Sequence, residues 1–93
     1  MIKSWKSEEA RKIFNREYSR HLPLAIQKTA LRKLWMLDAA VSLNDLRVPP
    51  ANHLEALKGE RSGQHSIRIN EQWRICFVWS QNDAYDVAII DYH

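Results

Sequence analysis

The sequence predicts an α+β domain in which two N-terminal helices pack on one face of a small, mostly antiparallel sheet. Two patterns carry this prediction. Residues 67–79 alternate between apolar and polar side chains around a short polar interruption, which is typical of a β-hairpin with one buried face. Residues 26–41 place apolar side chains at intervals of three or four, which is typical of an amphipathic helix. In chain order, the expected elements are one strand, two helices and three strands.

Length and composition favour one globular domain. The 93 residues suffice for a single modest core, and we expect residues 1–93 to form that one domain. A formal net charge of +3 is too common among small proteins to identify a nucleic-acid partner by itself. The single cysteine, Cys76, excludes a disulfide framework, and we expect neither a metal nor another cofactor. Without a signal peptide or a long apolar run, the expected location is the cytoplasm, with no membrane partner.

The N-terminal part is expected to contain a short edge strand at residues 2–5 and two helices. Ser7 followed by two glutamates is typical of a helix start, since its hydroxyl can cap the first turn and the helix dipole favours carboxylates there. We expect this helix to reach about Tyr18. Pro23 occupies the first turn of the second helix. The apolar stripe of that helix consists of Ile26, Ala30, Leu34, Leu37 and Val41.

Basic residues concentrate in these two helices. Residues 11–37 contain seven lysines and arginines against a single acid, Glu17. Lys28, Arg32 and Lys33 lie on one side of the second helix, away from its apolar stripe. A solvated helix surface and an RNA-binding surface explain this basic side equally well at this point.

The C-terminal part is expected to contain a hairpin and a final strand. Residues 43–46 could add a helical turn before two prolines end it, and residues 52–63 are polar and irregular. In the hairpin, the apolar side chains of the two strands share one face only if Arg68 lies opposite Arg74 and Ile67 lies opposite Ile75. That register leaves a three-residue loop at Asn70, Glu71 and Gln72. Asn82 and Asp83 mark a second turn, and residues 85–92 form an interior strand.

This register has a chemical consequence. It places two arginines opposite each other on the sheet face away from the core, where like charges repel unless an anion lies between them. Arg68 and Arg74 could equally decorate a solvated sheet face.

Candidate catalytic side chains are dispersed along the second half of the chain. Cleaving RNA through a ribose 2′-hydroxyl needs a base, an acid and cations that stabilise the charge on phosphorus, and no metal is required. Arginine suits the last task because its planar fork can bind two phosphate oxygens. The candidates are Lys58, Arg61, Arg68, Arg74, Asp91, Tyr92 and His93. Taken alone, the last three are more typical of a polar chain end, and Tyr92 could also face the core.

Six segments together resemble the HigB toxins of the RelE/ParE superfamily. They are MIKSW at 1–5, MLDAA at 36–40, LKGER at 57–61, SIRI at 66–69, QWRI at 72–75 and DYH at 91–93. No single segment is specific, but their order and spacing are, and they span nearly the whole chain. The resemblance implies a compact microbial RNase fold and a ribosome-dependent mRNA endonuclease that acts in the ribosomal A site. It also implies a HigA-type helix-turn-helix antitoxin as partner, besides the ribosome and mRNA.

The resemblance also implies roles for individual residues. Lys58 and Arg74 match the phosphate-contacting cations of the family, and Asp91, Tyr92 and His93 match its C-terminal catalytic group. In the resulting hypothesis, His93 and Tyr92 transfer protons and Asp91 orients them. The residues expected to bind RNA are Arg61, Arg68, Lys28, Arg32 and Lys33.

One departure from the family pattern affects the expected base. Some relatives have a histidine just before the LKGER-type segment, and here that position is Glu55. Glu55 could act as a carboxylate base, His53 could substitute from nearby, or the enzyme could be weaker. Two other functions stay open from sequence: a non-enzymatic ParE-like toxin that inhibits DNA gyrase, and a nucleic-acid-binding module without catalysis.

Overall fold

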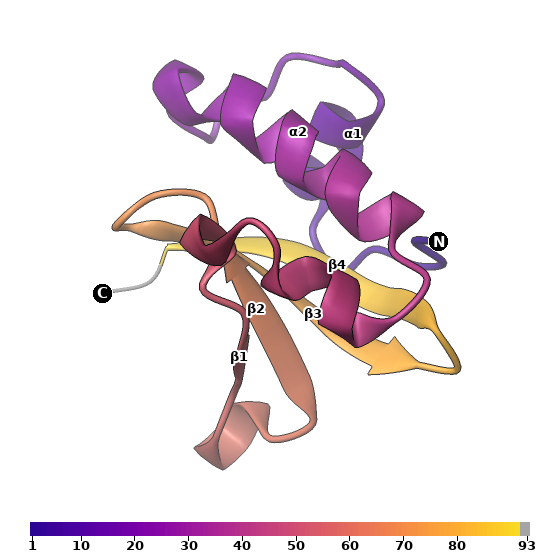
Figure 1. The fold of residues 1–93 in the computed structure, drawn as a ribbon. Helices are drawn as coiled ribbons and strands as arrows, with labels where there is room; N and C mark the ends of the chain where they lie inside the picture. The colour runs from indigo at the N-terminus through magenta and orange to yellow at the C-terminus, as the bar shows by residue number, and fades with distance from the viewer. Residues whose placement is uncertain (92–93) are drawn as a thin grey trace.

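Two helices cover one face of a four-stranded antiparallel sheet in the computed structural model, which describes residues 1–91 (Figure 1). Helix α1 spans Glu8–Phe14 and helix α2 spans Leu24–Ala39. The strands lie in the order β1-β2-β3-β4, and each pairs antiparallel with its neighbours. This arrangement confirms the predicted α+β class and the predicted position of the helices.

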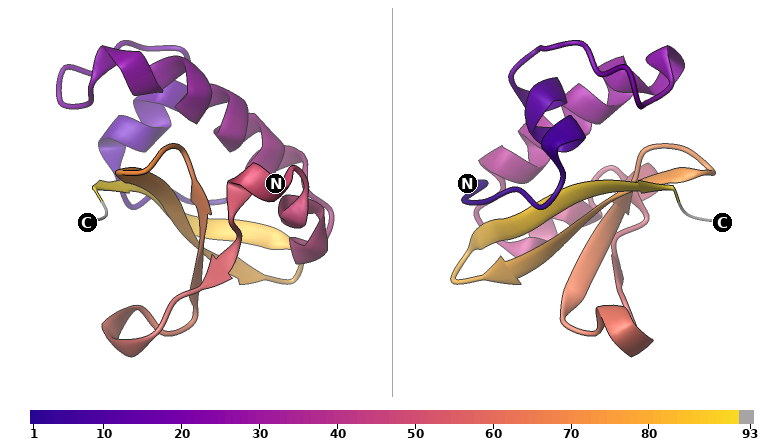
Figure 2. Two further views of the ribbon diagram at one scale, coloured as in Figure 1. Left: turned by 60° about the vertical axis from the view of Figure 1, so that its left-hand side comes forward. Right: turned by 180° about the vertical axis from the view of Figure 1, so that it is seen from behind.

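The strands differ greatly in length. Strand β1 spans Glu55–Ala56, β2 spans Gln64–Arg68, β3 spans Trp73–Ser80 and β4 spans Asp83–Asp91. Three short 3-10 helices complete the elements: η1 at Leu43–Arg47, η2 at Pro50–Asn52 and η3 at Gly59–Arg61. The segment from β1 through η3 to β2 projects from the sheet on the side away from α1 and α2 (Figure 2).

The predicted element order was wrong at two places. Residues 2–5 do not form a regular strand; they make two isolated parallel bridges to β4, Ile2 with Ala84 and Trp5 with Val87. Between these bridges Asp86 has a positive φ of 53°, which interrupts regular pairing, and the Ser7 cap begins α1 directly afterwards. The additional strand, β1, forms within the segment that was expected to be irregular.

The hairpin register agrees with the prediction at each predicted pair. Arg68 lies opposite Arg74 and Ile67 opposite Ile75, and the Ile69 N–H donates to the Trp73 carbonyl at 2.9 Å. The Asn70 side-chain oxygen closes the turn by accepting from two backbone N–H groups at 2.8 Å, as asparagine often does in turns. The parity argument therefore fixed the sheet face on which each hairpin side chain lies.

Helix α1 begins as predicted but ends earlier. The Ser7 hydroxyl accepts from the Ala10 N–H at 3.1 Å, which confirms the N-cap. The helix ends at Phe14 rather than near Tyr18, because Arg16 adopts a left-handed conformation with φ 62°. The N–H groups of residues 16 and 17 then turn back to carbonyls of the last helical turn, which is a common way to end a helix.

Helix α2 buries its predicted apolar stripe except for one residue, and one residue of its predicted basic side is also buried. Ile26, Ala30, Leu34 and Leu37 are buried against the sheet. Val41 is 73% exposed because the helix ends at Ala39, so its predicted place in the core was wrong. Lys33, expected on the exposed basic side, is buried instead.

The core lies between the helices and the sheet. Fully buried Phe77, Ile75 and Ile67 contribute from the sheet, and Leu34 and Leu37 contribute from α2. No helix within residues 1–91 is long and apolar enough to cross a membrane.

Candidate active site

The sheet face turned away from the helices carries the polar side chains of the hairpin. Residues directly opposite each other on antiparallel strands share a face. The register therefore aligns Arg68 with Arg74 in one row, and Glu55, Ser66 and Cys76 in the next row. Ile67, Ile75 and Phe77 lie on the other face, in the core.

Arg74 is the most firmly held cation on this face. Its Nε donates to the hydroxyl of buried Ser66 at 2.8 Å, and one terminal nitrogen donates to the His53 carbonyl at 2.6 Å. The same terminal nitrogen lies 3.9 Å from the Glu55 carboxylate. Only 11% of the Arg74 side chain is exposed. These contacts fix the orientation of the guanidinium before any ligand binds.

The loop that supplies the His53 carbonyl is itself held by a buried polar pair. The Asn52 side chain donates to the Leu46 and Val48 carbonyls at 3.1 and 3.4 Å, and it accepts a hydrogen bond from the Lys33 ammonium. His53 follows at the end of η2 in a left-handed conformation with φ 44°. Lys33 thus stabilises the loop that positions Arg74. The residue is only 4% exposed, and its predicted contact with RNA stays a prediction.

Burial also affects the charge of this lysine. It lowers the pKa of the Lys33 ammonium, and the neighbouring Arg32 charge lowers that pKa further. A buried ammonium is tolerated when it has a hydrogen-bond acceptor, which the Asn52 amide oxygen provides.

The two opposed arginines do not depend on a bound anion to balance their repulsion. The Arg68 Nε donates to the Asn70 carbonyl at 3.1 Å, and its terminal nitrogen lies 3.9 Å from the Glu71 carboxylate. Arg74 has its own acceptors in Ser66 and His53. Each guanidinium is stabilised separately, so the pairing predicted from sequence is correct but does not by itself demonstrate an anion site.

Glu55 and Arg61 belong to the same electrostatic environment. Burial raises the pKa of the Cys76 thiol, the charges of Arg61 and Arg74 lower it, and that of Glu55 raises it. These three charged groups therefore act on one region of the sheet face. Lys58 is exposed on the connection between β1 and β2, directly before η3.

The remaining predicted catalytic residues lie at the end of β4. Asp91 pairs with Trp73, so it lies on the opposite side of the sheet from Arg74, and it accepts from the Gln72 amide at 3.1 Å. Tyr92 and His93 lie outside the described residues, so their predicted proton-transfer roles stay predictions. Within residues 1–91, no group of three or more His, Cys, Asp or Glu side chains is arranged to hold a metal ion.

The two exposed cations of α2, Lys28 and Arg32, share one groove along that helix, and only one of them also borders a second groove near the sheet. Arg32 lines a groove that also contains His53, Arg68 and Asn70, next to the Arg74 anchor. Lys28 does not line that groove, although it is also exposed on α2. Of these two exposed cations, Arg32 is therefore the one that shares a groove with Arg68.

Three groups that build the site were not assigned from sequence. Ser66 is the first residue of the segment SIRI at 66–69. Because it lies two residues before Arg68 on the same strand, the alternation places its side chain on the same sheet face as Arg68 and Arg74. The Asn52 amide and the His53 carbonyl had no such signal, because their effect depends on how the irregular segment folds.

Comparison with known proteins gives a consistent result. Residues 3–93 match the family model described as the RelE-like toxin of the type II toxin–antitoxin system HigB. The chain is 44% identical over 78 residues to Toxin HigB-1 of Vibrio cholerae serotype O1, covering 82% of each chain. It is 31% identical over 93 residues to Endoribonuclease HigB of Proteus vulgaris, covering all of both chains.

Two solved structures share the fold at lower identity. The YoeB–YefM toxin–antitoxin complex from Staphylococcus aureus contains a chain that matches with TM-score 0.61 and 21% identity, covering 100% of this chain and 98% of that one. YafQ from E. coli matches with TM-score 0.57 and 12% identity, covering 98% and 93%. At these identities the likeness establishes the fold alone.

Proposed function

Since this chain belongs to the RelE-like HigB toxins of type II toxin–antitoxin systems, we propose that it inhibits translation by cleaving mRNA on the ribosome. The observation that carries the proposal is Arg74, an oriented guanidinium on the sheet face that the helices leave uncovered. The name of the Proteus vulgaris relative, Endoribonuclease HigB, favours the nuclease over a gyrase inhibitor or a binding module without catalysis.

The proposed reaction is attack of a ribose 2′-hydroxyl on the adjacent phosphorus, without a metal. Arg74 would stabilise the charge that grows on the phosphoryl oxygens, and its fixed orientation suits this role because preorganised donors need no rearrangement during the reaction. Lys58 would add a second cation from the β1–β2 connection. The leaving 5′-oxygen would take its proton from the C-terminal group, with His93 and Tyr92 as donors and Asp91 orienting them.

Glu55 is the proposed base. Its carboxylate lies 3.9 Å from the Arg74 guanidinium and is half exposed, so it can reach a ribose next to a phosphate bound by Arg74. His53 is the alternative base, because its backbone carbonyl accepts from Arg74 and the exposed residue borders the neighbouring groove.

The proposed partners are a HigA-type helix-turn-helix antitoxin, the ribosome and mRNA, in the cytoplasm. A small domain offers limited surface for positioning a flexible strand, and positioning can supply roughly 7–11 kcal/mol of a catalysed barrier. The ribosome would provide that positioning by holding the message in its A site. Arg32, Arg68 and Arg61 would contribute salt-sensitive contacts with RNA.

We expect purified protein to leave naked mRNA largely intact and to cut the same mRNA when translating ribosomes are present. The measurement is primer extension on both samples at physiological salt, with the Arg74→Ala variant as the inactive control. Rapid digestion of naked RNA would contradict ribosome dependence. Intact message on ribosomes together with inhibition of a topoisomerase would contradict the nuclease itself.

Ser66→Ala is expected to slow cleavage up to about tenfold without unfolding the domain. The substitution removes the acceptor of the Arg74 Nε–H, and a hydrogen bond to a charged group contributes about 1.5–3 kcal/mol, of which only part affects the transition state. The check is single-turnover cleavage on ribosomes beside a thermal melt. Ser80→Ala, at an exposed serine of the same sheet, is the matched control. An unchanged cleavage rate would show that Arg74 keeps its position without the Ser66 hydroxyl.

A further inference from the structure

Helix α2 has a second stripe of apolar side chains that the domain buries only in part. Leu24, Leu31 and Trp35 follow each other at spacings of seven and four, so they share one side of the helix. Leu24 is 71% exposed and Trp35 is 43% exposed. Tyr18, which is 62% exposed, adds an aromatic ring from the loop after α1. Large apolar side chains grouped on a surface are typical of a binding site for another protein.

Tyr18, Leu31 and Trp35 line a groove on the helical layer, and Leu24 lies outside it. One part lies between the end of α1 and α2 and is bordered by Ile13, Tyr18, Leu31 and Trp35. A second part continues along α2 and shares Lys28, Leu31 and Trp35 with the first. The helices lie on the core side of the sheet, so this groove is separate from the face that carries Arg74 (Figure 1).

The rim of the groove is positively charged. Arg16, Lys28 and Arg32 border it, and the Arg16 guanidinium lies over the Trp35 ring at 5.0 Å from the ring centre. Glu17 is the only acidic residue among the lining residues, and its carboxylate already lies 3.6 Å from an Arg11 nitrogen. The groove therefore offers an apolar floor with an excess of cations, which suits an acidic partner.

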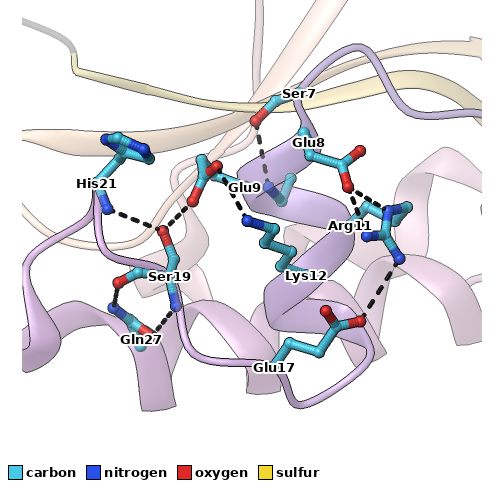
Figure 3. Close-up of polar contacts among 10 residues, drawn as sticks. Ser7, Glu8, Glu9, Arg11, Lys12, Glu17, Ser19, His21 and Gln27 are labelled. Atoms are coloured by element: carbon cyan, nitrogen blue, oxygen red, sulfur yellow. Dashed lines mark hydrogen bonds and ion pairs between the residues drawn. The ribbon is translucent and has the colours of Figure 1, made fainter.

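The loop that forms one wall of the groove is held in place. Buried Ser19 donates to the Glu9 carboxylate of α1, and the Gln27 amide of α2 donates to the Ser19 carbonyl at 2.8 Å (Figure 3). The same amide donates to the Leu22 carbonyl at 3.0 Å. The Ser19 N–H in turn donates to the Gln27 side chain at 3.3 Å. These contacts connect both helices through the loop, so the wall exists before a partner binds, which lowers the entropic cost of binding.

We infer that this groove binds an acidic, amphipathic segment of the antitoxin, with apolar side chains against Leu31 and Trp35 and carboxylates near Lys28 and Arg16. A helix placed in an apolar groove with a charged rim is a common mode of peptide recognition. This inference rests on the proposed function, which supplies an antitoxin as partner, and it adds the surface and the chemistry of the contact.

The test measures growth and affinity for the antitoxin encoded beside the toxin gene. Trp35→Asp is expected to remain toxic when expressed alone but to escape neutralisation on co-expression with the antitoxin. Its affinity for the purified antitoxin, measured by calorimetry, is expected to fall about a hundredfold, as for a central aromatic in an interface. Tyr18→Asp changes an exposed loop residue and is expected to weaken binding in the same direction, with less risk to the fold. Val48→Asp, at a 73% exposed site outside the groove, is the matched control and should be neutralised like the wild type.

Salt dependence tests the charge of the partner. Affinity for the antitoxin is expected to fall as ionic strength rises, and Lys28→Gln is expected to reduce that dependence. Folded Trp35→Asp and Tyr18→Asp variants that the antitoxin neutralises normally would overturn the inference. So would sedimentation showing that the groove joins two copies of this chain, or antitoxin affinity that does not change with salt. A wild-type protein that fails to inhibit growth would instead contradict the proposed function, and the two failures are thereby distinguishable.

Discussion

Replacing Arg74 with alanine is expected to abolish growth inhibition while leaving a folded domain. The guanidinium is the oriented cation of the sheet face, and losing a charge-assisted contact with phosphate removes about 1.5–3 kcal/mol, or roughly ten- to a hundredfold in rate. The measurement is growth on induction together with single-turnover cleavage on ribosomes. A thermal melt of the purified variant separates loss of chemistry from loss of fold.

Arg74→Lys sharpens this experiment. Lysine keeps the charge but lacks the planar fork that contacts Ser66 and His53 together, so activity should stay well below that of the wild type. Arg74 also joins β3 to the loop at His53, and its removal should therefore lower the melting temperature slightly. A folded, fully toxic Arg74→Ala protein would place the active site elsewhere.

Phe77→Ala is expected to unfold the domain or nearly so. Phe77 is fully buried in the centre of β3, and its ring lies 6.2 Å from the His65 ring and 6.3 Å from the Trp79 ring. Truncating a buried aromatic costs about 3–5 kcal/mol. Small domains have only about 5–15 kcal/mol of stability in total. The measurement is urea unfolding, and toxicity should disappear together with soluble protein.

Trp73→Ala provides the comparison. The hairpin register correctly places Trp73 on the core side, but its side chain is only partly buried there. Truncating Trp73 should therefore lower the free energy of unfolding by less than truncating Phe77. The alternation of apolar and polar residues in the sequence does not reveal this difference. Val48→Ala, at an exposed site, should leave the unfolding midpoint unchanged. Equal loss of stability in the two aromatic variants would contradict the burial described for β3.

The hairpin register could be predicted because the residues that determine it lie close together in the sequence. Ile67 and Ile75 can share the buried face only in a register that also places Arg68 opposite Arg74, and the structure has this register. The Ser7 cap could be predicted for the same reason, since both groups of the hydrogen bond lie within one helical turn.

What the sequence did not reveal depends on distant contacts. Periodicity placed Lys33 beside Arg32 on a basic surface, but its acceptor, Asn52, is 19 residues away in a segment without a regular pattern. Likewise, the anchor of Arg74 at position 53 is a backbone carbonyl, which every residue type possesses. The sequence thus offered Arg74 as a candidate, whereas the contacts that orient its guanidinium could not be predicted.

The pairing of the N-terminal segment with β4 has a consequence for how this protein is made. Ser4 accepts a hydrogen bond from the Asp86 N–H, and Trp5 pairs with Val87, so both residues need partners that are synthesised more than 80 positions later. Contacts so distant in sequence form late and slow the completion of a fold. During synthesis the chain cannot close its sheet until β4 has emerged, and that strand also completes the pairing of β3 on the side opposite β2. The sheet of this domain is therefore completed only after β4, which spans Asp83–Asp91, has been synthesised.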